Sequence, residues 1–263
     1  MKEEETAAAR AYQELHVPAL FQQWTSLVAD AAKIQAGQRV LDVGCGTGVL
    51  AREVSSRVGS IGNVVGVDPN PGMLAVANEL GPEIDWRPGV AESLPCDDAS
   101  FDTVVSQFGL MFFPDRTNAI REMLRVLEPG SRLAVAVWDS LENSESYAIE
   151  AEVLDRIGGK PAGDALRAPF VLGDTKELKA LFDDAGFADV EVETHVGTGR
   201  FPSIRTMVEA DLRGWLPVMG VHLEEETIDR IFHEAEGALA RYVTPDGAVE
   251  FDSPGHIVTG RRP

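Results

Sequence analysis

The sequence predicts a doubly wound α/β fold, in which helices cover both faces of a mostly parallel sheet. Two observations carry this prediction. Between residues 39 and 138, short apolar runs alternate with longer amphipathic stretches, as in successive βαβ units with right-handed crossovers. The first apolar run, residues 40 to 43, ends in Gly44, Gly46 and Gly48, and an amphipathic stretch begins directly after them. This order indicates a buried strand, a tight glycine loop and a helix N-terminus.

Composition narrows the class of protein. The chain has 263 residues and 44% hydrophobic side chains, enough for one full α/β domain with additions. It carries 43 Asp and Glu against 23 Lys and Arg, and its formal charge is −20. Such a charge repels phosphate backbones and anionic membranes, so we expect no nucleic-acid partner.

Cysteine content and hydropathy exclude further classes. The two cysteines, Cys45 and Cys96, provide neither a disulfide framework nor a metal-binding pair, so we expect no metal site. Cys45 lies inside the glycine loop, where a small space-filling side chain is the simpler interpretation. We expect no membrane span, because no apolar run is long enough, and residues 1 to 5 do not resemble a signal peptide. These features indicate a cytoplasmic protein.

The N-terminal 36 residues precede the alternating region, and residues 6 to 35 of them are predicted to be helical. Apolar side chains such as Leu20, Trp24 and Val28 recur at helical spacing and form one stripe. Pro18 interrupts the pattern, so we expect two helices, with Pro18 near the start of the second, and Gly37 ending them.

The alternating region supplies the sheet. The predicted strands are Val40–Val43, Asn63–Asp68, Ile84–Arg87, Phe101–Ser106 and Arg132–Trp138. Predicted helices cover Val49–Val58, a segment capped by Asn70 with Pro71 in its first turn, and 115–127. Ligands bind at the carboxyl ends of such strands. One rim should therefore carry Gly44, Asp68, the segment after Arg87, Ser106-Gln107 and Trp138-Asp139.

Beyond residue 140 the alternation loosens. Helices are predicted at Tyr147–Ile157, Asp174–Ala185, Ser203–Trp215 and Glu224–Tyr242. We expect residues 158 to 161 to end the first of them, and Asp174 with Glu177 to cap the second before Gly186 ends it. A strand is predicted at 189–196, and the turn at 244–247 should lead into two short β runs, the last at 256–259.

The glycine loop and Asp68 together indicate a nucleoside-containing ligand. A helix N-terminus offers unpaired N–H groups to acceptor atoms, and Asp68 at the end of the second strand can accept both hydroxyls of a ribose. The third glycine of a dinucleotide fingerprint would stand at Val49, which argues against NAD or FAD. A ligand-free turn at the loop, and an Asp that only turns the chain before Pro69, fit these residues less well.

Five motifs in order resemble the class I S-adenosylmethionine-dependent methyltransferases. Within residues 38 to 138 these motifs occupy 40–48, 65–74, 89–95, 100–105 and 122–130. They are most similar to the small-molecule branch that includes the ubiquinone and menaquinone C-methyltransferases. The resemblance implies a Rossmann-like sheet, mostly parallel with an antiparallel last strand, plus N-terminal helices and a helical lid inserted near the C-terminus.

The resemblance also implies a division of the chain. The expected parts are an N-terminal helical cap (1–36), a cofactor-binding core (37–140), helices and a sixth strand that complete the sheet (141–202), a helical lid (203–244) and the last strand (245–263).

By resemblance, the cofactor is S-adenosyl-L-methionine and the product S-adenosyl-L-homocysteine. The glycine loop would hold its methionine and sugar, Asp68 the ribose, Met73 and the backbone of Ala91 the adenine, and Gln107 would lie near the methionyl end. The expected cofactor residues are Asp42, Gly44, Cys45, Gly46, Gly48, Asp68, Pro69, Met73, Ala91, Glu92 and Gln107. Val90 stands where the family often has an Asp that bonds the adenine, so Glu92, backbone atoms or apolar contacts would take over.

The implied reaction transfers a methyl group to an oxygen, carbon or nitrogen atom of a small, apolar or aromatic acceptor. The acceptor pocket is predicted to include Phe108, Met111, Phe112, Trp138 and Trp215, although such a cluster is often only core.

An acidic acceptor would also need a base. The candidates are Tyr12 and His16, in helices that often cover the cofactor in this family, and His222, between two predicted lid helices. A packing role is open for Tyr12, His16 and His195, and a solvated loop position for His222. Asp139, at the end of the fifth strand, is on the correct rim but is equally a turn residue.

Two other functions compete with this one. A protein that binds or senses S-adenosylmethionine without turnover would fit the missing base and Val90. A nicotinamide-dependent oxidoreductase is disfavoured by Val49 and by the lack of a Tyr-x-x-x-Lys pair. A monomer and a homodimer are both compatible with the sequence.

Overall fold

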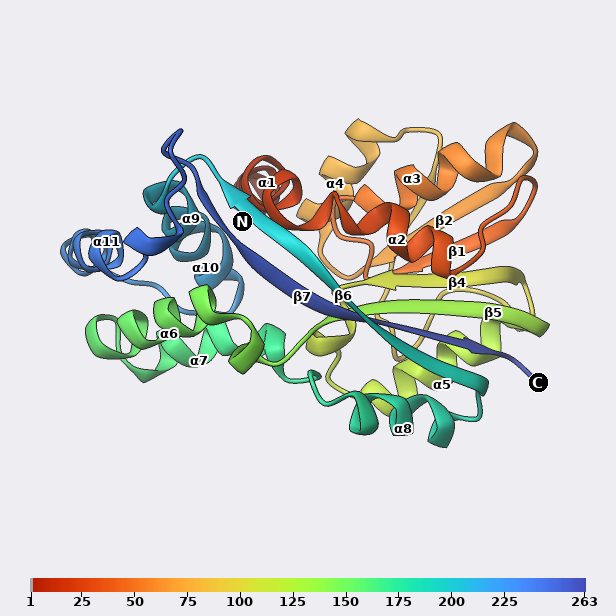
Figure 1. The fold of residues 1–263 in the computed structure, drawn as a ribbon. Coiled ribbons are helices and arrows are strands. Elements are labelled where there is room, and N and C mark those ends of the chain that lie inside the picture. Colours follow the sequence, from red (N-terminus) through yellow and green to blue (C-terminus); the bar gives the residue numbers. More distant parts are fainter. Residues whose placement is uncertain (1) are drawn as a thin grey trace.

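A seven-stranded sheet forms the centre of the computed structural model, which describes residues 2–263 and, from residue 6 onward, their side chains (Figure 1). The strand order is β3-β2-β1-β4-β5-β7-β6, and among the described strands only β7 runs in the opposite direction to the others. The strands are β1 Arg39–Val43, β2 Asn63–Asp68, β3 Asp85–Pro88, β4 Phe101–Gln107, β5 Leu127–Trp138, β6 Ala188–Phe201 and β7 Val249–Arg261. The Rossmann-like sheet with an antiparallel last strand is therefore confirmed.

Helices cover both faces of this sheet. Figure 1 shows α2, α3 and α4 above the sheet and α5 and α8 below it. These helices are α2 Trp24–Ala31, α3 Val49–Val58, α4 Pro71–Leu80, α5 Arg116–Val126 and α8 Thr175–Ala185. Because the middle strands are covered twice, Val40, Leu41 and the last six residues of β5 are buried, which explains their continuous apolar runs.

The predicted caps form as expected. The Asn70 side chain accepts hydrogen bonds from the backbone N–H groups of Gly72 and Met73 at 2.8 and 3.2 Å, which starts α4 at Pro71. Asp174 caps α8 in the same way, and Gly186 ends it in the left-handed conformation at φ +100°.

The N-terminal segment differs from the prediction. α1 Lys2–Ala11 continues into a π-helix, η1 Tyr12–Phe21, and α2 follows after two residues. Pro18 lies inside η1, so its expected place at the start of a second helix is wrong. A proline removes one N–H donor, and the wider π-helical turn accommodates the changed hydrogen-bond register within a continuous helix.

The C-terminal half forms a group of helices at one end of the sheet, shown at the left of Figure 1. They are α6 Glu145–Ile157, α7 Lys160–Arg167, α9 Ile204–Glu209, the π-helix η6 Ala210–Trp215, α10 Leu216–Val218 and α11 Glu225–Ala238. α7 was not predicted. Gly158 ends α6 as expected, but Pro161 then stands in the first turn of a new helix, where its fixed φ is favourable. Among the described residues, no helix is both long and apolar enough to span a membrane.

Short 3-10 turns connect these elements: η2 Gly59–Ile61, η3 Leu110–Phe112, η4 Leu141–Asn143, η5 Ala168–Phe170 and η7 Ala240–Tyr242.

The last two strands are longer than predicted. β6 and β7 pair from Ala188 with Arg261 to Phe201 with Val249, so the two expected short β runs are in fact one strand. Pro254 and Gly255 weaken the β signal in the middle of β7. Pairing with β5 and β6, together with the Trp24 ring packed against Gly255, keeps this stretch extended. The lid helices follow β6 at the far end of this long hairpin.

Alanine substitutions at Gly48 and Gly46 should show which of these two glycines is required for packing. A Cβ on Gly48 (φ +80°) would lie 2.3 Å from the Trp86 ring, which also packs against Gly66 and donates a hydrogen bond to the Gly81 carbonyl. We expect Gly48→Ala to lower the free energy of unfolding by about 3 kcal/mol, combining backbone strain and overpacking. A Cβ on Gly46 (φ +53°) would meet nothing, so Gly46→Ala should cost about 1 kcal/mol.

Urea unfolding of both variants measures this difference. Equal losses of stability would contradict the packing role of Gly48.

Candidate functional site

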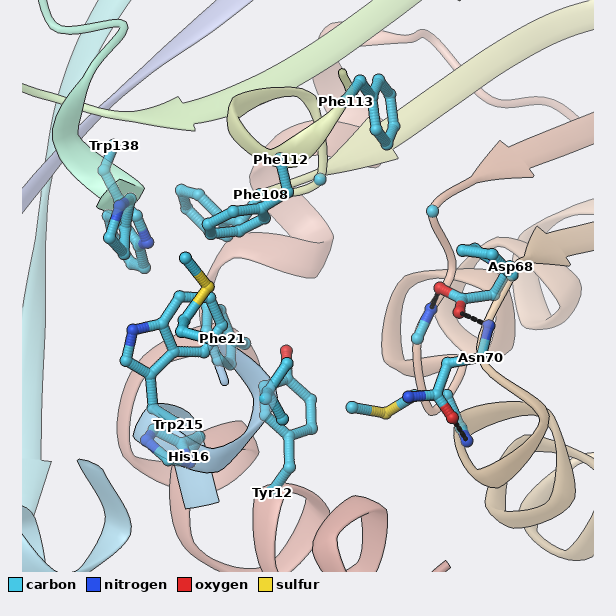
Figure 2. A pocket seen from close by; sticks show the side chains of 18 of the residues that line it. Tyr12, His16, Phe21, Asp68, Asn70, Phe108, Phe112, Phe113, Trp138 and Trp215 are labelled. Atoms are coloured by element: carbon cyan, nitrogen blue, oxygen red, sulfur yellow. Dashed lines mark hydrogen bonds between the residues drawn. The ribbon is translucent and has the colours of Figure 1, made fainter. Parts of the chain in front are cut away.

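A cavity of about 550 Å³ opens at the carboxyl edge of the sheet. The rim of the sheet forms one side, and the N-terminal helices and the lid form the other (Figure 2). Its lining includes Tyr12, His16, Phe21, Gly44, Gly46, Asp68, Pro69, Asn70, Met73, Val90, Ala91, Glu92, Phe108, Phe112, Trp138, Tyr147, Asp211, Trp215 and Met219. A smaller recess of about 60 Å³ lies behind the glycine loop.

The glycine loop is held against the end of β2. The backbone N–H groups of Gly44 and Cys45 donate to the Val67 carbonyl at 2.8 and 3.1 Å. The N–H of Gly46 donates to Asp68 Oδ2 at 2.9 Å. Gly44 has φ +69°, in the left-handed region that favours glycine. The loop and Asp68 therefore meet at one point of the rim, as the strand order requires.

Asp68 faces the cavity with acceptor capacity to spare. Its Oδ1 accepts from the N–H of Asn70 at 2.8 Å, as Oδ2 does from Gly46, and each oxygen keeps a second lone pair. Burial raises the pKa of Asp68, while these two backbone hydrogen bonds lower it in part. The carboxylate is placed to receive hydroxyl groups from a ligand.

The recess behind the loop contains unpaired polar atoms. Both carboxylate oxygens of Asp42, Thr47 Oγ1 and Gln107 Oε1 are buried without a hydrogen-bond partner among the described residues. Burial raises the pKa of Asp42 to about 7; Asp68 adds to the increase, and the backbone of Ala51 offsets part of it. A buried, unpaired acceptor is costly, so the recess is suited to a ligand that brings hydrogen-bond donors or positive charge.

The part of the rim beside Asp68 is less polar than the recess. Pro69, Met73 and the backbone from Gly89 to Glu92 line the cavity beside Asp68. The side chain of Val90 is 46% exposed, and Glu92 Oε1 accepts from the N–H of Asp115 at 3.2 Å. The side chains of Pro69, Met73 and Val90 make this part of the cavity largely apolar.

Aromatic rings form the opposite wall. Phe108 and Trp138 stack with centroids 3.7 Å apart and planes 12° from parallel, and the Phe21 ring contacts both. Phe112 and Trp215 meet at 5.0 Å, which joins the rim of the sheet to the lid. Phe108 has a φ of +55°, a strained conformation for a bulky side chain, and the hydrogen bond from its N–H to the Ala136 carbonyl at 2.9 Å holds it there.

Comparisons with known proteins agree with this geometry. A family model described as "Methyltransferase domain" matches residues 41–135. The ubiquinone/menaquinone biosynthesis C-methyltransferase UbiE of Cronobacter sakazakii is 34% identical over 191 residues, which cover 66% of this chain and 76% of that protein. UbiE of Escherichia coli (strain K12 / DH10B) is 36% identical over 185 residues, covering 64% and 73%. The chain belongs to the class I S-adenosylmethionine-dependent methyltransferases.

Solved structures share the fold of this methyltransferase. The YcgJ protein of Bacillus subtilis superposes with a TM-score of 0.60 at 20% identity, covering 91% of this chain and 98% of that one. Phosphoethanolamine N-methyltransferase 2 of Haemonchus contortus, solved with S-adenosyl-L-methionine, gives a TM-score of 0.61 at 18% identity, covering 98% and 57%.

The family determines the cofactor and the class of reaction. S-adenosylmethionine is the cofactor, and the methyltransferase acts on a small molecule. Neither a sensor without turnover nor a nicotinamide-dependent oxidoreductase has support from the comparisons.

The structure of the methyltransferase separates the sequence-predicted site residues into groups. Gly44, Gly46, Asp68, Pro69, Met73, Ala91 and Glu92 line the large cavity, as do Phe108, Phe112, Trp138 and Trp215. Asp42, Cys45 and Gln107 line only the recess. Gly48 packs against Trp86 and Met111 is core, and neither lines either space.

The candidate bases also differ in whether they line the cavity. Tyr12 lines both spaces and His16 the cavity, whereas His222 is exposed on a loop of the methyltransferase and lines neither. His195 packs edge-on to Trp24, and Asp139 binds Ser140 and Asn143, both away from the cavity lining.

Sequence reasoning missed Asp211, which lines the cavity from η6. Its one sequence signal is an acidic residue within an otherwise apolar turn, Ala210 to Leu212.

The raised pKa of Asp42 predicts a pH dependence of the methyltransferase's stability. Without ligand, folded Asp42 keeps its proton up to about pH 7, whereas its ordinary pKa is 3.8. The contribution of protonated Asp42 to the free energy of unfolding is therefore fully present below pH 3.8 and is lost as the pH rises through about 7. Relative to Asp42→Asn, the wild type should lose about 4 kcal/mol of unfolding free energy over this range.

Denaturant titrations from below pH 3.8 up to about pH 7 test the prediction, with Asp102→Asn as a control of opposite sign whose change falls below pH 3.8. Hydrogen bonds from Arg39 lower the pKa of Asp102, so the wild type should gain stability over that variant as the pH rises towards 3.8. Parallel pH profiles for the wild type and Asp42→Asn would refute the role of Asp42.

Proposed function

We propose that this methyltransferase methylates a ring carbon of a small quinol-type acceptor, with cofactor and acceptor in the same cavity. The main support for this proposal is that one cavity of about 550 Å³ is lined both by the glycine loop and Asp68 and by a wall of aromatic rings. The relatives named as ubiquinone and menaquinone C-methyltransferases support this acceptor class.

The proposed donor end follows from hydrogen-bonding capacity. Asp68 would accept the ribose hydroxyls, because each of its oxygens keeps a free lone pair. Asp42 and Gln107, together with the loop from Gly44 to Gly46, would receive the amino-acid part, because the unpaired oxygens in the recess fit an ammonium group. Pro69, Met73, Ala91 and Glu92 would surround the adenine. Gly48 would act indirectly, by admitting the Trp86 ring.

Charge favours a neutral acceptor. No Lys or Arg is among the described residues that line the cavity, so an anionic acceptor would have no counter-charge there. The rings of Phe108, Phe112, Trp138 and Trp215 offer flat apolar surface that fits an aromatic ring.

When bound, S-adenosylmethionine supplies an electrophilic methyl group on its sulfonium. The enzyme's own residues hold donor and acceptor in line and exclude water. The N-terminal cap (1–36) and the lid (203–244) would do so by covering the cavity, since Tyr12 and Phe21 line it from one and Trp215 and Met219 from the other. The core (37–140), the segment 141–202 and the last strand (245–263) would support them. The net charge of −20 supports the absence of a nucleic-acid partner.

Product analysis tests the proposed function. The enzyme is incubated with S-adenosylmethionine carrying a deuterated methyl group and a reduced, short-chain quinone. We expect S-adenosylhomocysteine and a product with the label on a ring carbon, identified by mass spectrometry and NMR. Label on oxygen, or no S-adenosylhomocysteine above the level without acceptor, would overturn the proposal.

Asp68→Ala should weaken S-adenosylhomocysteine binding by at least about tenfold, because charge-assisted hydrogen bonds to the ribose are lost. Calorimetric titration measures the dissociation constant. Asp85→Ala is the matched control, because Asp85 lies on the neighbouring strand β3 but is half exposed, pairs with Arg87 and does not line the cavity. Unchanged affinity in a folded Asp68→Ala protein would remove Asp68 from the site.

A further inference from the structure

We propose that His16, paired with Asp211, is the general base that takes the hydroxyl proton of the acceptor. This inference rests on the proposed function, because a quinol becomes a strong carbon nucleophile once its hydroxyl is deprotonated. The pair joins the two covers of the cavity, since His16 belongs to η1 and Asp211 to η6 in the lid.

The geometry of the pair is that of a base with an orienting carboxylate. His16 Nε2 lies 3.3 Å from Asp211 Oδ1, and the two residues are 5% and 3% exposed. Both line the cavity, and Figure 2 labels His16 among the lining side chains, together with Tyr12, which stacks on it. With its proton on Nε2, neutral His16 donates to Asp211 and keeps a lone pair on Nδ1, which is buried and has no hydrogen-bond partner among the described residues.

Packing holds the imidazole in place. The Tyr12 ring stacks on it at 5.6 Å and the Phe201 ring meets it edge-on at 6.4 Å. Gly214 approaches its remaining side, where a Cβ would lie 3.3 Å from His16 Cε1 and 3.8 Å from Nδ1. Because Gly214 has no side chain, the backbone of η6 packs closely against this edge of the imidazole.

A second buried acid, Glu150, interacts electrostatically with Asp211. Glu150 on α6 is fully buried, and neither of its carboxylate oxygens has a hydrogen-bond partner in the described part of the chain. Burial together with Asp211 raises its pKa well above the ordinary value. Burial also raises the pKa of Asp211, whereas its bond to His16 lowers it. Tyr147, also on α6, has its pKa raised by burial and by these two carboxyls. Burial therefore disfavours the charged forms of Glu150 and Tyr147, whereas the bond to His16 favours the charged form of Asp211.

The other candidate bases do not meet these conditions. Burial and the nearby Asp68 raise the pKa of Tyr12, which disfavours its anionic form. Among the five histidines of the chain, all within the described residues, only His16 lines the cavity. Asp68 and Glu92 line it too, but both lie at the proposed donor end, where Asp68 would bind the ribose and Glu92 would lie beside the adenine.

The step balances in protons and electrons. The O–H bond of the acceptor breaks, its proton joins His16 Nδ1, and the electron pair stays on oxygen and is shared with the ring carbon. The imidazolium charge is then opposed by Asp211. After the methyl group adds, the ring carbon loses its own proton and the oxygen regains one, so one proton is released for each methyl transferred.

A chromophoric acceptor mimic tests the base without requiring turnover. We would titrate 4-nitrophenol, whose phenolate is yellow, in the presence of the enzyme and S-adenosylhomocysteine. In the wild type the bound probe should ionise about tenfold more readily than in water, because the imidazolium stabilises the phenolate. His16→Gln should abolish this shift. His222→Gln, the same change in an exposed loop outside the cavity, should retain it.

Kinetics supply the second measurement. With a quinol acceptor, His16→Gln should lower kcat about 100-fold or more and remove the acidic limb of the pH–rate profile, while S-adenosylhomocysteine affinity stays unchanged. Asp211→Asn keeps an oxygen that accepts the hydrogen bond from His16 Nε2–H but removes the negative charge. It should therefore shift the acidic limb of the pH–rate profile and lower kcat less than His16→Gln does.

Two outcomes distinguish the proposals. If the wild type methylates a quinol and His16→Gln matches its rate and pH profile, the base is wrong and the proposed function stands. If the wild type methylates no quinol, the proposed function fails, and the nitrophenol titration still decides the base. Equal probe ionisation in the wild type and His16→Gln would overturn the role of His16.

Discussion

The attachment of the glycine loop to the end of β2 is the constraint on which the rest of the site depends. Three backbone N–H groups, from Gly44, Cys45 and Gly46, donate to the Val67 carbonyl and to Asp68. These bonds set the shape of the loop, turn the Asp68 carboxylate towards the cavity and leave the oxygens of Asp42 unpaired behind it. The proposed donor end is therefore fixed by neighbouring parallel strands, which are among the most buried parts of the protein.

The acceptor end depends on a different kind of interaction. Stacked rings at Phe108 and Trp138 end two adjacent strands, and Phe21 from the N-terminal segment and Trp215 from the lid complete the apolar wall. Apolar packing is not directional, so this wall can be shared by segments far apart in the sequence. The same elements carry His16 and Asp211, and each side chain finds its main polar partner on the opposite cover of the cavity.

The long hairpin of β6 and β7 explains how those covers meet. β6 continues to Phe201, and the lid begins directly after it, so the hairpin carries η6 to the end of the sheet where η1 lies (Figure 1). Trp24 packs against Gly197 and Gly255 on the two strands, which joins the N-terminal helices to the same hairpin. A change at these glycines would therefore disturb both covers of the cavity.

The sequence by itself determined the sheet, the glycine loop, the caps at Asn70 and Asp174 and the place of Asp68. Each of these depends on local chemistry: apolar runs, backbone conformation and side-chain hydrogen bonds within a few residues. Only the tertiary structure decided the π-helix around Pro18, the single strand through Pro254, the packing role of Gly48 and the pairing of His16 with Asp211. In these cases the partner lies on another element, and contacts with it outweigh or complete what local propensity can indicate.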